Sequence, residues 1–499
     1  MLHTVIFDKQ IRVWWEPVVN MAKGAAYTVY LDGKSIGETC HTHMTLTELL
    51  PSTEYMLRVL DAFGNEVGSC SATTTAEKKR INVTEAPYFA VGDGKTLNTK
   101  ALQRAFDDCG EGEAVYLPAG IYMTGSLRMH EGTELYVDED AVLQGTDDPD
   151  DYMPKIPSRF EGLHMECYAA LINIGHIDSK GKPNCRGVVI RGGGSIFGGG
   201  RPLADRVIER ERVLLADYIA SLGDKVKECE NDRTIPGRKR PRLINMSNAA
   251  DVVIADVHVG YGACWNVHMI YSENIVTCGC TIRSEKVWNG DGWDPDSSEN
   301  CVIFDCDFYT GDDSVAIKSG KNPEGNAVNR PSKHVRVFDC RCHSGHGITV
   351  GSEMSGGVED VFVWDCDLSG SNFGMEIKGT KKRGGYVRDI HVLDCRMPRI
   401  MMHSVRYNDD GEGASTAPIF EDCLFERVCL TGRAHMNDGE IVDCNVLDLH
   451  GFEEEGHEIK NVTLREVTVE SSLDSPARMA FALCNGVNVE NLRACARKE

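Results

Sequence analysis

A short phrase recurs along the middle of the chain and constrains the fold more than any other feature. It consists of alternating apolar residues that end in an acidic residue and a cysteine, at 302–306, 335–340, 361–366, 390–395 and 419–423. Weaker copies lie at 254–257 and 275–280, and the last residues of successive copies are 23 to 34 residues apart. One strand phrase per repeat at this period predicts a solenoid of stacked β-coils.

Stacked coils place equivalent positions above one another, so the repeat also predicts which polar residues share a surface. Counted from the final cysteine of the preceding phrase, Asp312 and His346 both lie at position six. Asp291 lies at position eleven and Lys378 at position twelve. Four consecutive coils therefore contribute polar residues at two recurring positions, which predicts one groove on one face.

The adjacent pair Asp312 and Asp313 is the strongest candidate for chemistry. Two ionised carboxylates repel each other, so a site that holds them together keeps one protonated, as general acid catalysis at a glycosidic oxygen requires. In a chain this acidic, an isolated Asp-Asp pair would mark only a solvated turn. Its place in the repeat beside Asp291 and His346 favours a catalytic site.

The chain divides into two predicted domains. Residues 1–78 contain short alternating strands separated by turns such as 32–33 and 63–65, which predicts a small β-sandwich. Within it, residues 46–55 resemble the fibronectin type III signature, in which a leucine and a proline precede a tyrosine, here Tyr55. Residues 79–499 form the predicted solenoid. Its Gly-Asp-Gly at 92–94, the helical pattern at 99–109 and the strand at 115–122 resemble the N-terminal cap of right-handed parallel β-helices of the pectinase type. The expected fold is all-β: a right-handed parallel β-helix preceded by a β-sandwich.

Residues from about 201 to 240 interrupt the repeat with a charged stretch that favours helix. We interpret it as an insertion between coils. Two readings stay open: a wall that closes one end of the groove, or an inert surface excursion.

Charge and cysteine content restrict the partners and the compartment. The net charge of −23 argues against nucleic acid and anionic membranes. An acidic sugar would need local cations, and six basic residues cluster around the candidate site in sequence: Lys318, Lys321, Lys378, Lys381, Lys382 and Arg383. The 20 cysteines include no CxxC pair with zinc-site spacing, so we expect buried, reduced thiols. With no signal sequence visible, a cytoplasmic location is expected. We expect neither metal nor organic cofactor, and a homo-oligomer stays possible.

From residue 92 to about 467 the chain resembles glycoside hydrolase family 28, the polygalacturonase family. Four ordered blocks carry the resemblance: Asn-Gly-Asp-Gly-Trp-Asp at 289–294, Gly-Asp-Asp at 311–313, Gly-His-Gly at 345–347 and Ile-Lys at 377–378. Residues 351–357 and 383–385 also look like bacterial members of that family.

This resemblance implies inverting hydrolysis of α-1,4-galacturonosidic bonds in pectic oligosaccharides. Asp312 would be the general acid, and Asp291 with Asp313 would orient and deprotonate the attacking water. His346 would hydrogen-bond to the acid or the sugar, and Lys378 would pair with a substrate carboxylate unless it forms a structural salt bridge. The implied substrate-binding set is Lys378, Asn289, Lys318, Glu353, Glu376 and Arg383.

Glu376 departs from the family pattern, because arginine usually precedes the Ile-Lys pair. The planar fork that binds a carboxylate twice is therefore missing. Either the leaving sugar is neutral, as in rhamnogalacturonan, or Arg383 holds its carboxylate, or Glu376 pairs internally with Lys378.

Exo action is expected from the insertion, the fibronectin-like module and the cytoplasmic location. Two other classes compete with a hydrolase. A pectate lyase shares the β-helix but abstracts a proton with calcium and leaves an unsaturated product. A non-catalytic carbohydrate-binding β-helix would not require three acids and a histidine in one groove.

Overall fold

The computed structural model describes residues 1–499 except 20, 473–474 and 498–499. It contains two compact units, one formed by Met1–Ile81 with Cys109–Ala114 and one formed by Asn82–Asp108 with Val115–Glu499. The predicted boundary between residues 78 and 79 lies close to the end of the first segment.

The smaller unit is a sandwich of two antiparallel sheets. One sheet has the order β1 (His3–Ile6), β2 (Ile11–Trp14), β5 (His43–Leu46), and the other has the order β4 (Lys34–Thr39), β3 (Tyr27–Leu31), β6 (Glu54–Leu60), β7 (Glu66–Thr73). In β6, Tyr55, Leu57 and Val59 are buried while the residues between them face solvent, as period-2 patterning requires. The Leu50 N–H donates to the Tyr55 hydroxyl at 2.9 Å. The predicted sandwich is confirmed, and its assignment to fibronectin type III stays a prediction.

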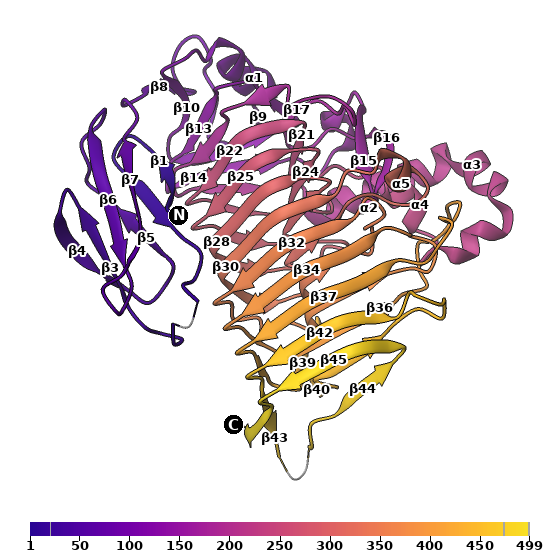
Figure 1. Ribbon diagram of the computed structural model, residues 1–499. Helices are drawn as coiled ribbons and strands as arrows, with labels where there is room; N and C mark the ends of the chain where they lie inside the picture. The colour runs from indigo at the N-terminus through magenta and orange to yellow at the C-terminus, as the bar shows by residue number, and fades with distance from the viewer. Residues whose placement is uncertain (20, 473–474, 498–499) are drawn as a thin grey trace. The chain divides into compact units, whose positions relative to one another are not determined.

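The larger unit is a right-handed parallel β-helix, as predicted (Figure 1). One face is an 11-stranded parallel sheet: β12 (Leu127–Met129), β17 (Ile172–Gly175), β21 (Ile244–Ser247), β24 (Val267–Ile270), β27 (Trp293–Asp296), β29 (Val315–Ile317), β31 (Gly347–Val350), β33 (Gly374–Gly379), β36 (Arg399–Ser404), β41 (Leu447–His450) and β44 (Met479–Ala482). A 20-stranded sheet supplies the rest of most coils through β22 (Ala249–Ala255), β25 (Glu273–Cys278), β28 (Glu299–Tyr309), β30 (Ser332–Ser344), β32 (Val358–Trp364), β34 (Tyr386–Leu393), β37 (Ile419–Glu426), β42 (Ile459–Arg465) and β45 (Cys484–Glu490).

The acidic residue of the repeated phrase marks a corner of each coil. Asp305, Asp339, Asp365 and Asp394 precede the phrase cysteines and have φ between 45° and 56°. Aspartate and asparagine tolerate this left-handed conformation better than other residues with a side chain. A second corner has the same conformation, for example at Asp389 with φ 54°. The phrase therefore encodes where the chain bends.

Side chains at equivalent positions of successive coils stack through the interior of the β-helix. Phe304, Phe338 and Trp364 form a continuous ring stack with centroid distances of 4.8 and 4.3 Å. Cys306 and Cys340 are neighbours in the parallel strand register, without a disulfide, and both are buried. All 20 cysteines are reduced thiols, as expected, and 12 of them are buried, but Cys40 and Cys495 are exposed, so the expected burial does not hold for every cysteine. Each added coil extends the same apolar columns, which is how a solenoid builds one core.

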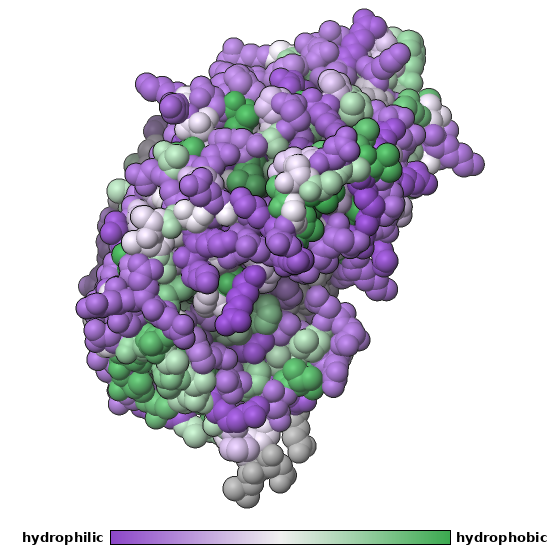
Figure 2. Space-filling model, turned by 90° about the vertical axis from the view of Figure 1, so that its right-hand side faces the viewer, coloured by the Kyte–Doolittle hydropathy of each residue, from purple (hydrophilic) through white to green (hydrophobic). Residues whose placement is uncertain are grey.

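Helices cover the start of the solenoid and interrupt it once. Helix α1 (Thr99–Asp108) fits the predicted cap, and the Gln103 side chain exchanges two hydrogen bonds with the Arg128 backbone of β12. The insertion folds as α2 (Gly200–Leu214), α3 (Ala216–Ser221), a 3₁₀ turn (Gly223–Glu228) and α4 (Thr234–Gly237) (Figure 1). Seen from the side that carries α3, the surface is mostly hydrophilic (Figure 2). Among the described residues, no helix has both the length and the apolarity to cross a bilayer.

Candidate active site

The four predicted catalytic residues lie just before three neighbouring strands of the 11-stranded sheet. Asp291 precedes β27, Asp312 and Asp313 precede β29, and His346 precedes β31. These strands pair in parallel, with Val315 between Trp293 and Ile348 in the register. Because neighbouring strands lie about 4.8 Å apart, the turns before them bring the side chains together.

His346 bridges the two adjacent carboxylates. Its Nδ1 lies 3.0 Å from Asp312 Oδ1 and 3.3 Å from Asp313 Oδ1. Asp313 also accepts a hydrogen bond of 2.7 Å from the Thr349 hydroxyl, and Lys378 Nζ lies 3.7 Å from its other oxygen. The Asp312 and His346 side chains are 22% and 23% exposed, whereas that of Asp313 is 5% exposed. Asp312 and His346 are therefore the members of this group that a ligand can reach.

The pairing fixes the charge states of His346 and Asp313. Burial lowers the pKa of His346, but the adjacent Asp312 and Asp313 outweigh burial and raise it to about 10. Burial raises the pKa of Asp313, but Lys378 and His346 outweigh it and hold this pKa below its ordinary value. An imidazolium and an ionised Asp313 thus coexist at neutral pH.

Asp291 belongs to a second, more deeply buried group around Lys318. Lys318 Nζ lies 3.3 Å from Asp291, 3.4 Å from Glu353 and 3.9 Å from Asp294. Burial and the mutual repulsion of Asp291 and Asp294 raise the pKa of Asp291, and burial raises the pKa of Asp294 to about 8. We assign the retained proton to Asp294, because Asp291 is nearer to the ammonium group.

Glu376 pairs internally with Lys378, which was one of the three expected alternatives. The Lys378 ammonium lies 2.8 Å from Glu376 Oε2, and His403 Nε2 lies 2.7 Å from Glu376 Oε1. The Lys378 side chain is 8% exposed. Lys378 therefore holds Asp313 and Glu376 in place, and the structure gives it the structural role that was the alternative to pairing with a substrate carboxylate.

The other expected substrate-binding residues are mostly buried. Arg383 is fully buried and donates to the Ser352 carbonyl, the Asn322 side chain and the Asn408 carbonyl. We therefore correct its expected role from sugar contact to positioning, since all its nitrogens face protein. Lys318 and Glu353 are likewise buried and paired.

Asn289 is half-buried, and its Oδ1 accepts a 2.7 Å hydrogen bond from Arg240. Arg240 lies at the end of the insertion and is itself fully buried. The insertion thus supports the Asn-Gly-Asp block directly.

Buried ion pairs fasten the insertion beside the site. Arg238 makes a bidentate pair with Asp410 at 2.8 and 2.9 Å and contacts Glu161 at 2.8 Å. Asp410 lies in the loop after β36, and Glu161 lies at the turn between β15 (Ile156–Phe160) and β16 (Leu163–Cys167). Because coils on both sides of the cluster anchor the insertion, the geometry favours a wall over an inert excursion.

Three residues near the cluster escaped the sequence analysis. Asp294 ends the Asn-Gly-Asp block at 289–294, but the sequence does not show that it is buried, and burial is what raises its pKa. His403 reaches Glu376 through the pairing of Lys378 with His403 in the next coil. Glu230 comes from the insertion; burial and Asp312 raise its pKa, and its N–H donates to the Asn408 side chain at 3.1 Å. Their positions follow from the register between neighbouring coils. Predicting that register requires knowing where each coil bends.

The ligand atoms of Asp312, Asp313 and His346 lie within 4.8 Å of one another, a spacing that could hold a metal ion. A metal ligand needs a neutral imidazole. Because the two carboxylates raise the pKa of His346 to about 10, its ring is protonated at neutral pH and fits a hydrogen-bond donor better than a ligand.

The fold and the carboxylate cluster define a parallel β-helical protein with a candidate acid–base site. Residues 208–415 match Glycosyl hydrolases family 28. The chain is 33% identical over 353 residues to a probable polygalacturonase of Vitis vinifera, covering 68% of this chain and 64% of that protein. It is 27% identical over 378 residues to an exo-poly-alpha-D-galacturonosidase of Dickeya chrysanthemi, covering 72% and 62%. The chain thus spans less than two thirds of each of these relatives.

The fold is also that of the family 28 exopolygalacturonase of Yersinia enterocolitica. The TM-score is 0.80 with 22% identity, and the likeness covers 100% of this chain and 97% of that chain.

Proposed function

We propose that this protein hydrolyses α-1,4-galacturonosidic bonds in pectic galacturonan oligosaccharides with inversion. The observation that carries the proposal is that Asp312 and His346 form a partly exposed pair. The more buried Asp313 lies beside them, and Asp291 lies on the adjoining coil. Asp312 is the carboxyl that a glycosidic oxygen can reach, so we assign it the general acid role. Asp313, held ionised, accepts a proton from water that Asp291 helps to orient.

The acidic sugar is supported by the names of the relatives, which are polygalacturonases. Glu376 no longer argues for a neutral leaving sugar, because its carboxylate pairs with Lys378 at 2.8 Å and contacts His403 at 2.7 Å within the protein. Exo action is supported by the insertion, which ion pairs hold beside the site. It places Glu230 close enough to Asp312 for the charge of Asp312 to raise the pKa of Glu230. The free thiols fit the cytoplasmic location that we also propose.

The test compares wild-type enzyme with Asp312→Asn on oligogalacturonates in EDTA, with products separated by chromatography. We expect saturated mono- or digalacturonate from the wild type and a loss of about 10²- to 10⁴-fold in the variant. Asp389→Asn, an exposed aspartate at a coil corner, is the matched control and should retain activity.

Three outcomes would overturn parts of the proposal. Unsaturated products would indicate a lyase. Cleavage of rhamnogalacturonan alone would replace the substrate. Internal cleavage of long chains, seen as a rapid fall in viscosity, would contradict exo action.

A further inference from the structure

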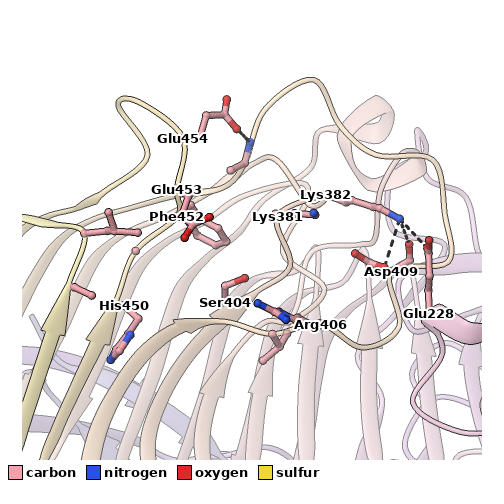
Figure 3. Close-up of a pocket in the computed structure, with 15 residues that line it drawn as sticks. Glu228, Lys381, Lys382, Ser404, Arg406, Asp409, His450, Phe452, Glu453 and Glu454 are labelled. Atoms are coloured by element: carbon pink, nitrogen blue, oxygen red, sulfur yellow. Dashed lines mark hydrogen bonds and ion pairs between the residues drawn. The ribbon is translucent and has the colours of Figure 1, made fainter.

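A cavity of about 960 Å³ lies next to the catalytic cluster along the β-helix. Its lining includes Lys381 after β33, Arg406 after β36, Glu453 after β41 and Glu228 from the insertion (Figure 3). Four segments distant in sequence thus build one hollow.

The strand register connects this cavity to the cluster. Lys378, beside Asp313, pairs with His403 in the next coil, and Ser404 lines the cavity. Strand β36 pairs in turn with β41, whose last residue His450 also lines it. Each step is about 4.8 Å, so the cavity begins one coil beyond Lys378 and continues along the same sheet.

Several charged side chains of the cavity lining already have partners. Lys382 lies 2.7 Å from Glu228 and 3.5 Å from Asp409. Glu454 accepts a hydrogen bond of 2.9 Å from the Ala417 N–H.

Two exposed cations in the cavity have no ion-pair partner among the described residues, namely Lys381 and Arg406. Glu453 is the matching unpaired acid. The lining also holds four carboxylates, those of Glu228, Asp409, Glu453 and Glu454. Two unpaired cations at one hollow are informative in a chain whose net charge is −23, because carboxylates outnumber cations in the chain as a whole.

We propose that this cavity binds a further uronate residue of the acidic oligosaccharide, next to the sugars at the cluster. Its carboxylate contacts the Arg406 guanidinium and the Lys381 ammonium, while Ser404 and Glu453 bind sugar hydroxyls. The proposal rests on the proposed function, since it extends the same substrate.

The test measures binding of tetragalacturonate to Asp312→Asn enzyme by calorimetry, with and without Arg406→Gln and Lys381→Gln. Each substitution removes a charge-assisted contact, so we expect Kd to rise about tenfold for Arg406→Gln and further for the double variant. Fully methyl-esterified tetragalacturonate should bind the pocket variants and the parent equally. The charge-matched control is Lys182→Gln with Arg493→Gln, two exposed cations outside the cavity.

Unchanged Kd in the double variant would overturn the proposal, and so would an equal loss in the control, which would indicate a general field effect. These outcomes are separable from failure of the proposed function, because the latter appears as absence of galacturonan cleavage by the wild-type enzyme. Once the wild-type enzyme is shown to cleave galacturonan, the pocket substitutions in the Asp312→Asn background test the cavity alone.

Discussion

At the scale of single residues, the site depends on buried charges that share protons. Lys318 faces Asp291, Asp294 and Glu353, and Arg383 lies 3.9 Å from Glu353. Three ionised carboxylates would therefore face two cations and leave uncompensated negative charge. A neutral Asp294 resolves the imbalance and leaves Asp291 available to bind water. The titration of this group is a property of the set of residues.

Replacing Asp294 with asparagine tests this assignment. The folded-state pKa of Asp294 is about 8, above an unfolded value of about 3.9, so its stability contribution is complete below pH 4 and is lost as pH rises through 8. Asparagine does not titrate. We therefore expect the free energy of unfolding of Asp294→Asn, relative to wild type, to increase between pH 4 and pH 8 in urea titrations.

Asp389→Asn, at an exposed position, should show no such trend. A pH-independent difference between Asp294→Asn and wild type would contradict a protonated Asp294.

The grouping of Asp312 with His346 could be predicted because the repeat itself aligns these two residues. What could not be predicted depends on depth and on neighbouring coils. Nothing local in the sequence shows that Arg383 is fully buried, or that Glu376 contacts His403 across a strand pair. The anchors of the insertion escaped for the same reason, since Arg238 and Asp410 are 172 residues apart.

At the scale of elements, the left-handed backbone at the coil corners restricts which residue types can occupy them. Asp389 has φ 54°, a conformation that costs most residues with a side chain about 1–2 kcal/mol. We expect Asp389→Val to lower the free energy of unfolding by about that amount, and Asp389→Asn to change it little, in urea unfolding. Equal effects of the two substitutions would mean that the corner does not constrain the residue type.

The insertion should behave as a fastened element. Removing the Arg238 side chain leaves Glu161 and Asp410 buried without their guanidinium partner, which typically costs about 3–5 kcal/mol. Arg206, on the same insertion, pairs with Asp147 at the surface, where such pairs contribute about 0–1 kcal/mol. Denaturant unfolding of Arg238→Ala and Arg206→Ala should reproduce this contrast. Similar small losses of unfolding free energy in both variants would indicate that the insertion is an inert surface excursion.

At the scale of the whole molecule, net charge opposes the proposed substrate. A chain of charge −23 repels a polyanion over about 30 Å in 0.01 M salt but only about 10 Å in 0.1 M salt. We expect kcat/KM on polygalacturonate to rise severalfold between these concentrations, with a smaller rise on highly methyl-esterified polymer. A steady fall with salt on both substrates would show that local cations dominate the encounter.

The pairing of β17 with β21 shows how tolerant this architecture is. Ile172 and Ile244 are direct neighbours in the sheet although 72 residues separate them, whereas Ile244 and Val267 are neighbours after 23. A coil is thus defined by where it bends and which strands touch, and the length of chain spent between bends is free. The segments that connect one strand to the next can be lengthened, exchanged or redesigned while the 11-stranded sheet keeps its strand spacing. Substrate preference and reaction chemistry can therefore evolve independently within one chain.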